Sequence, residues 1–140
     1  MGVIEQTNRV GDPQSQGRAK VAVGTYDFAV DGGAVGALTL RGDTIPAGAV
    51  ITDSLIVVQT KVESGGEATV LLSAEAEGDL QASKKVSEAP WSTATPKRGA
   101  VTATGTPVAT TAARGIVAKV GTAALTKGKF KVLVTYMEVA

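Results

Sequence analysis

The chain has 140 residues, a length at which one domain can bury a core without needing disulfides or a metal. It contains neither cysteine nor histidine, which excludes disulfide frameworks, thiolate or imidazole metal sites, and Cys-His or Ser-His-Asp catalysis. The 14 basic and 13 acidic residues give a net charge of +1 without a long run of one sign, so we expect no nucleic-acid binding.

The N-terminal segment differs in texture from the rest of the chain. Residues 1–17 are polar and rich in turn formers, with few apolar side chains to offset the entropy lost on ordering. We therefore expect an extended arm over 1–17 and a single β-domain over 18–140. No secretion signal opens the chain, and no stretch approaches the ~20 apolar residues that span a bilayer, so we expect a soluble protein without membrane contact.

Short segments rich in β-branched residues follow the arm and alternate with Gly, Pro and Asp turns. The pattern predicts strands over 20–28 and 37–40, and then a strand over 55–62 whose apolar run at 55–58 indicates cover on both faces. Ser64-Gly65-Gly66 predicts a turn that joins 55–62 to 68–72 as a β-hairpin.

The second half is less regular. Residues 75–85 suit a short helix or an irregular loop, and the prolines at 90, 96 and 107 disfavour helices over 86–110. Further strands are expected at 115–120 and 129–139. In the last strand one face is apolar and the other, with Leu133 and Met137, is partly buried. Together these elements predict an all-β fold, an antiparallel β-sandwich or β-barrel with an extended N-terminal arm.

Few residue groups offer chemistry. Glu75, Glu77 and Asp79 alternate in a way that could hold calcium, but an exposed acidic loop is the favoured interpretation because calcium takes about 6–8 oxygen ligands. Arg41-Gly42-Asp43 spells an integrin-binding tripeptide, but an ordinary turn between strands is the favoured interpretation. We predict no catalytic, cofactor-binding or metal-binding residue, and no enzyme activity. A hydrolase that depends on carboxylates is the enzymatic alternative, although no two acids form a pair.

Trp91 follows Pro90 in a loop, where it either anchors the loop in the core or forms an interface hot spot. We predict that Trp91 and the apolar residues of the arm, Val3, Ile4 and Val10, contact a partner.

Several segments resemble small virion structural proteins of tailed phages, especially phages of actinobacterial hosts. The likeness covers roughly residues 25–135 and is carried by Tyr26-Asp27-Phe28-Ala29-Val30-Asp31-Gly32-Gly33-Ala34-Val35-Gly36, Leu38-Thr39-Leu40-Arg41-Gly42, Ile45-Pro46-Ala47-Gly48-Ala49-Val50-Ile51, Thr60, Ser64-Gly65-Gly66, Ala89-Pro90-Trp91-Ser92 and Ala123-Ala124-Leu125-Thr126-Lys127-Gly128-Lys129-Phe130.

The resemblance implies a capsid decoration (cement) protein that is made in the host cytoplasm and located on the capsid surface of the virion. Its partner would be the major capsid protein, it would stabilise the head, and it would form a homo-oligomer, with a trimer preferred by analogy. No cofactor is implied. The alternative is a tail or head-fibre component, possibly one that binds a host surface glycan.

Overall fold

The computed structural model describes residues 18–94, 96–99 and 108–139, so the arm predicted over 1–17 lies outside the described residues. Most of the described chain is in β-strands, and its one helix is a single turn, α1 (Phe28–Asp31). The strands are β1 (Ala19–Asp27), β2 (Gly36–Ile45), β3 (Ala49–Ser64), β4 (Thr69–Ser73), β5 (Gln81–Lys85), β6 (Pro96–Arg98), β7 (Val108–Ala109), β8 (Arg114–Gly121) and β9 (Leu125–Glu138).

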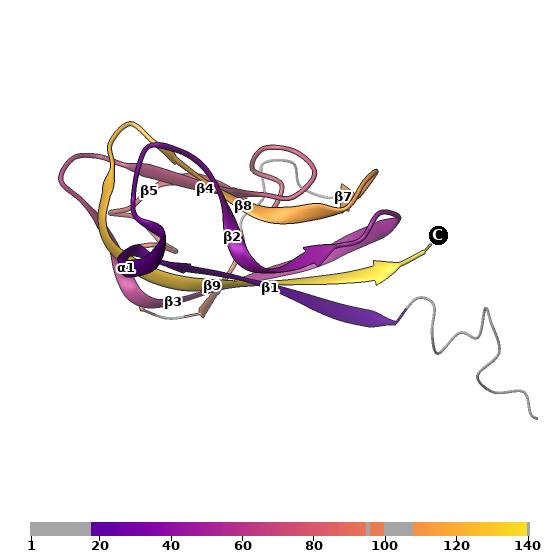
Figure 1. Cartoon of the computed structure of the whole chain (residues 1–140). Coiled ribbons are helices and arrows are strands. Elements are labelled where there is room, and N and C mark those ends of the chain that lie inside the picture. Colours follow the sequence, from indigo (N-terminus) through magenta and orange to yellow (C-terminus); the bar gives the residue numbers. More distant parts are fainter. Residues whose placement is uncertain (1–17, 95, 100–107, 140) are drawn as a thin grey trace, which may run out of the picture.

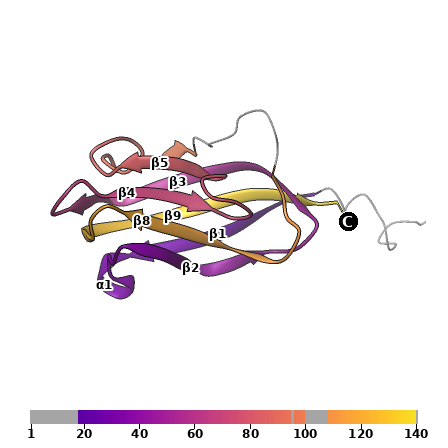
Figure 2. The same ribbon diagram turned by 90° about the horizontal axis from the view of Figure 1, so that it is seen from above.

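The strands form one antiparallel sheet that curls into two facing layers (Figure 1). The strand order is β5-β4-β8-β2-β1-β9-β3-β6, and β7 also pairs with β3. Figure 2 shows β4, β8 and β2 lying over β3, β9 and β1. The predicted all-β antiparallel fold is confirmed.

Strand β2 belongs to both layers, because it changes partner along its length. Gly36–Thr39 and Thr44–Ile45 pair with β8, whereas Arg41 and Gly42 pair with β1, and the β8 register shifts between Thr39 and Thr44. A local irregularity of this kind bends a strand sharply. The bend in β2 is what joins the two layers into one sheet.

At the opposite side of the molecule, side chains close the gap between the layers. Ser54 of β3 donates its hydroxyl to the carbonyl of Leu80 (3.0 Å), and Gly99 donates its N–H to the carbonyl of Ser54 (2.9 Å). A Cβ at Gly99 would lie 2.1 Å from the Leu80 carbonyl oxygen. The two edges of the sheet therefore lie close together here, with their backbones in contact. They do not form a continuous row of strand-to-strand hydrogen bonds.

The core lies between the layers and is built by strict alternation along the long strands. Phe130, Val132, Val134 and Tyr136 of β9 are all buried, as the period of 2 in the sequence predicts. An aromatic cluster lies at the centre, with the ring of Phe130 5.0 Å from that of Tyr26 and 4.9 Å from that of Trp91. The three aromatic residues of this cluster are the largest fully buried side chains of the described chain.

The predicted hairpin of 55–62 with 68–72 is wrong. β3 pairs with β9, β6 and β7, whereas β4 pairs with β5 and β8 in the other layer. β3 and β4 each have one buried face. Because the two strands lie in opposite layers, both of these faces pack against the core between the layers. The turn at Ser64-Gly65-Gly66 thus carries the chain from one layer to the other.

Two local predictions also need correction. The segment 81–85, expected as a helix or loop, forms the edge strand β5. The chain after Tyr26 makes the helical turn α1, which Asp27 caps by accepting the N–H of Ala29 (3.0 Å). In 55–58 the side chains alternate between buried and partly buried, so that stretch is fully covered on one face only.

Candidate contact surface

The outer face of β1, β9 and β3, which is turned away from the core, carries two rows of apolar side chains, with Thr135 and Asp53 in the row between them. Three side chains form a row across it, since Val23 pairs with Leu133 and Leu133 pairs with Leu55. A second row runs through Ala19, Met137 and Val50. Most of these side chains are only partly buried, and Val21 between the rows is 52% exposed. Solvated sheet faces are normally polar, so this outer face has the composition of a contact surface.

The sequence contained a signal for this surface. In 49–57 and 129–137 apolar residues occur at both odd and even positions, so both faces of each strand carry them. The sequence pattern of 129–139 predicts a partly buried second face for the last strand. In β9, Leu133 and Met137 of that face are partly buried. That the rows of β1, β9 and β3 coincide could not be foreseen, because it depends on the strand order.

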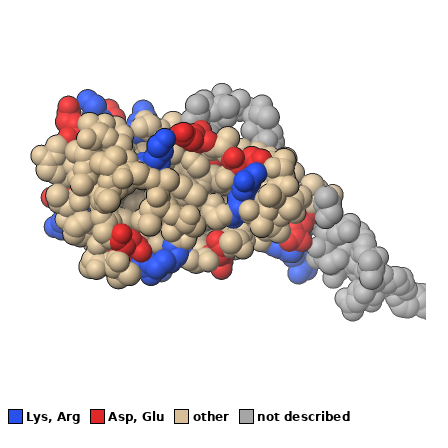
Figure 3. Space-filling model, turned by 45° about the horizontal axis from the view of Figure 1, so that its top comes forward, with Lys and Arg blue, Asp and Glu red and all other residues tan. Residues whose placement is uncertain are grey.

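Charges of both signs are dispersed over the described chain, and about half of the basic side chains form ion pairs. Seven ion pairs link acidic and basic side chains, among them Lys20–Glu138, Arg41–Asp31 and Lys119–Glu77. Figure 3 shows both signs interspersed over the visible face, with broad uncharged areas between them. Strong nucleic-acid binding relies on a concentrated basic surface, and the visible face offers none.

Trp91 is 0% exposed and packs against Phe130 in the core. Its backbone also holds the loop in place, because its carbonyl accepts the N–H of Val62 (3.1 Å). In the single chain, Trp91 therefore acts as a loop anchor, and its indole has no surface to offer a partner. Val3, Ile4 and Val10 lie outside the described residues, and their contact with a partner stays a prediction.

Arg41-Gly42-Asp43 lies within strand β2, and its side chains are engaged within the chain. Arg41 makes a two-bond ion pair with Asp31 (2.9 and 3.1 Å), which lowers the pKa of that carboxyl. Asp43 accepts the N–H of Val23 (3.0 Å). Gly42 has φ +132°, and a Cβ there would lie 2.1 Å from the Val23 carbonyl oxygen. The tripeptide thus lies at the bend within β2, and the predicted turn between two strands is wrong.

The acidic loop between β4 and β5 is stabilised by three separate sets of contacts. Glu75 binds the Arg114 guanidinium (2.8 and 3.2 Å) and the Thr111 hydroxyl (2.8 Å), which together lower its pKa to about 2. Glu77 pairs with Lys119, while Asp79 accepts the three consecutive N–H groups of 74–76. Among the described residues no three acidic side chains converge on a point that could hold a cation.

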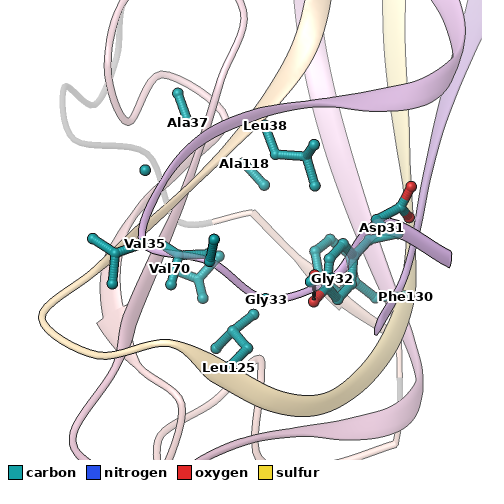
Figure 4. A pocket seen from close by; sticks show the side chains of 14 residues that line it. Asp31, Gly32, Gly33, Val35, Ala37, Leu38, Val70, Ala118, Leu125 and Phe130 are labelled. Carbon is teal, nitrogen blue, oxygen red and sulfur yellow. Dashed lines mark hydrogen bonds between the residues drawn. The ribbon is translucent and has the colours of Figure 1, made fainter. Parts of the chain in front are cut away.

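A small pocket of about 110 Å³ opens beside the connection between α1 and β2 (Figure 4). Its walls are mostly apolar, with Leu38, Val70 and Leu125 among them. Its polar groups already have partners, because the Tyr26 hydroxyl donates to the Gly32 carbonyl (2.6 Å) and Asp31 binds Arg41. Burial, together with the charges of Asp31 and Asp27, raises the pKa of Tyr26 to about 12. The pocket therefore offers a ligand an apolar cavity but few free hydrogen-bonding side chains.

Sugar-binding sites commonly expose an aromatic ring, and the described chain exposes none. Trp91, Tyr26, Phe130 and Tyr136 are buried, and Phe28 is partly buried against the core. In the part of the chain that the structure describes, no helix has the length and apolar character needed to cross a membrane.

Comparison with known proteins identifies a fold shared with chains from bacteriophage capsids. One is a chain in the acid-stable capsid structure of Helicobacter pylori bacteriophage KHP30, with a TM-score of 0.59, 15% identity, and coverage of 87% of this chain and 89% of that one. The other is a chain in the capsid asymmetric unit of cyanophage Pam1, with a TM-score of 0.60, 18% identity, and coverage of 98% and 91%. No family model and no curated protein matches the sequence.

Proposed function

We propose that this protein is a structural component of a phage virion, namely a decoration (cement) protein that binds the outer surface of the head. The apolar outer face of β1, β9 and β3 carries this proposal, since it provides a broad surface for a neighbouring subunit. The fold shared with chains from two phage capsids supports it. The role needs no catalysis.

Head binding combines two parts of the chain in this proposal. The arm, residues 1–17, adds a strand to an exposed sheet edge of the major capsid protein, where main-chain hydrogen bonds give affinity. Fully extended, an arm of this length reaches roughly 55 Å. The β-domain lies against the shell through its outer face. Repeated weak contacts of a homo-oligomer, with a trimer at local three-fold positions preferred, add up through multivalency.

Removing the arm tests its part in the proposal. A chain lacking residues 2–17 is expected to fold as the full chain does and to lose co-sedimentation with heads that lack the protein. Undiminished binding of the shortened chain would contradict the arm's role.

A pair of matched substitutions tests the outer face. Leu133→Lys places a charge in the middle of the outer face of β9, and we expect it to abolish head binding. Leu71→Lys is the control, because Leu71 is also partly buried but points outward from β4 in the opposite layer. Equal binding by the two variants would show that the outer face of β1, β9 and β3 is not the contact surface.

Immunogold labelling of virions separates this proposal from a tail or head-fibre location. Label on the head supports a decoration protein, and label confined to the tail or fibres overturns it. A glycan-binding fibre role has little support from the described residues, because no aromatic ring is exposed.

A further inference from the structure

The N-terminal half of β1 is an open edge of the sheet. β1 pairs with β9 along its whole length, from Ala19 to Asp27, but on its other side it pairs with β2 only at Gly24 and Thr25. Figure 1 shows β1 continuing along β9 after β2 has turned toward the other layer. The segment 19–22 is thus a strand end whose second side pairs with no strand among the described residues.

The backbone groups on that side can be identified. Val23 donates its N–H to Asp43 of β2, and its carbonyl oxygen is the atom that a Cβ at Gly42 would strike, so both groups of Val23 point toward the open side. Alternate residues of an antiparallel strand direct their N–H and C=O to the same neighbour. Ala19 and Val21 therefore present their N–H and C=O groups to the open edge.

Open edges are usually blunted by a charge, a proline or a bulge. The segment 19–23 has no proline. Its one lysine, Lys20, forms an ion pair with Glu138 of β9 (3.0 Å), so its charge is neutralised and does not protect the edge. Instead, the edge carries Val21, which is 52% exposed. These are the properties of an edge that pairs with another strand.

We infer that the open edge of β1 pairs antiparallel with the same edge of a second copy of this chain, centred on Val21. In this register Val21 lies opposite Val21 of the second copy, so two exposed valines cover each other. Moving the centre by one residue would set Lys20 opposite Lys20, and like charges directly opposite each other destabilise a sheet.

Charge complementarity supports the same register. With Val21 at the centre, Arg18 of the second copy comes to the point where β2 occupies the edge, next to Val23, whose N–H Asp43 already accepts. The Asp43 carboxylate is located there, exposed and bound only to the Val23 N–H among the contacts of the described chain. Two Arg18–Asp43 pairs thus form, one at each end of the contact.

This contact goes beyond the proposed function and does not depend on it. It is two-fold, so it is a separate contact from the three-fold one proposed above and links subunits in addition to it. It also joins the outer faces of two copies into one wider apolar surface. Because it forms without heads, its failure in solution leaves the head-binding tests unaffected.

The absence of cysteine allows a direct test. In the Val21→Cys variant of the full chain, the two new thiols lie opposite each other at a Cα separation that permits a disulfide. We expect a disulfide-linked dimer to be its main product on mild oxidation. Val35→Cys is the control, because Val35 is similarly exposed (57%) but lies on the loop before β2. Equal crosslinking of the two variants would overturn the inference.

Sedimentation over a concentration series provides a second test that needs no crosslink. Asp43→Lys is expected to lose the two-fold association, and Arg18→Asp combined with Asp43→Lys to restore it. Failure of the double variant to restore association contradicts the register. A full chain that does not associate through β1, while a chain lacking residues 2–17 does, would show that the chain's own arm occupies the edge, and the inference would then be wrong.

Discussion

At the scale of single residues, the bend of β2 depends on a glycine. Gly42 has φ +132° and lies so close to Val23 that a Cβ would overlap its carbonyl oxygen. Gly42→Ala is expected to lower the free energy of unfolding by about 2 kcal/mol, from backbone strain alone. Gly65→Ala is the control, because nothing lies within 4 Å of a Cβ there and its φ is not in the left-handed region. Urea unfolding of both variants checks this, and equal stability would contradict it.

A second residue-scale prediction concerns pH. The pKa of Glu75 is lowered to about 2 from 4.5, chiefly by its hydrogen bonds with Arg114 and Thr111. A carboxyl with a depressed pKa in the folded state stabilises the protein above its unfolded pKa, and this contribution disappears as the pH falls through the folded value. Glu75→Gln should therefore be less stable than the natural chain at pH 7.

The stability difference between the two proteins should stay constant down to about pH 5 and shrink between about pH 4.5 and pH 2, following the two pKa values. Thermal unfolding followed at several pH values measures the difference. A difference that does not change with pH would mean that the loss comes from packing and not from the charge of Glu75.

At the scale of elements, the backbone of 74–76 in the loop between β4 and β5 is held by a single carboxylate. Asp79 accepts the N–H groups of Ala74, Glu75 and Ala76 at 2.7–2.8 Å. Asp79→Ala leaves these donors without a partner and should cost about 2–3 kcal/mol. Glu77→Ala removes only an exposed ion pair with Lys119 and should cost well under about 1 kcal/mol. Denaturant unfolding compares the two, and a larger loss for Glu77→Ala would contradict this account of the loop.

Another element-scale prediction concerns the loop that Trp91 closes. Its indole fills the space beside Phe130, and its Nε1 has no hydrogen-bond partner among the described residues. Trp91→Ala should therefore cost about 3–5 kcal/mol through the cavity it creates. Trp91→Phe should cost less, because a ring still packs on Phe130 and an unpaired buried donor is removed. The two free energies of unfolding decide the matter, and equal losses would argue against a packing role.

At this scale the sequence predicts strands better than their partners. The alternation that predicted β9 depends only on neighbouring residues, and the buried face of Phe130, Val132 and Val134 follows from it directly. The hairpin prediction failed because the turn at Ser64-Gly65-Gly66 is compatible with two outcomes, pairing side by side or crossing to the other layer. The choice depends on β9, which occupies one edge of β3 and is more than sixty residues away in the sequence.

The candidate contact surface shows the same limit. Leu133 and Met137 could be recognised as partly buried from the strand pattern alone. Their union with Val23, Leu55 and Val50 into rows exists only once β1, β9 and β3 are neighbours. For Trp91 the sequence does not choose between core and interface, because a lone tryptophan in a loop fits either place until its ring contacts are known.

At the scale of the whole molecule, β2 makes the two layers interdependent. It pairs with β8 in one layer and with β1 in the other, so neither layer is complete without it. We expect a single cooperative unfolding transition. The fluorescence of Trp91, which reports the packing between the layers, and far-UV circular dichroism, which reports the strands, should change at the same denaturant concentration. Two separate midpoints would mean that the layers unfold independently.

The full-length pairing of β1 with β9 has a mechanical consequence. A pull on the chain ahead of Ala19 acts along β1. The load is then shared by the whole nine-residue ladder, whose hydrogen bonds must give way together. A pull applied across the strands would instead open them one after another. Such a pull thus loads β1 in shear, the loading direction in which a short β-strand resists force best.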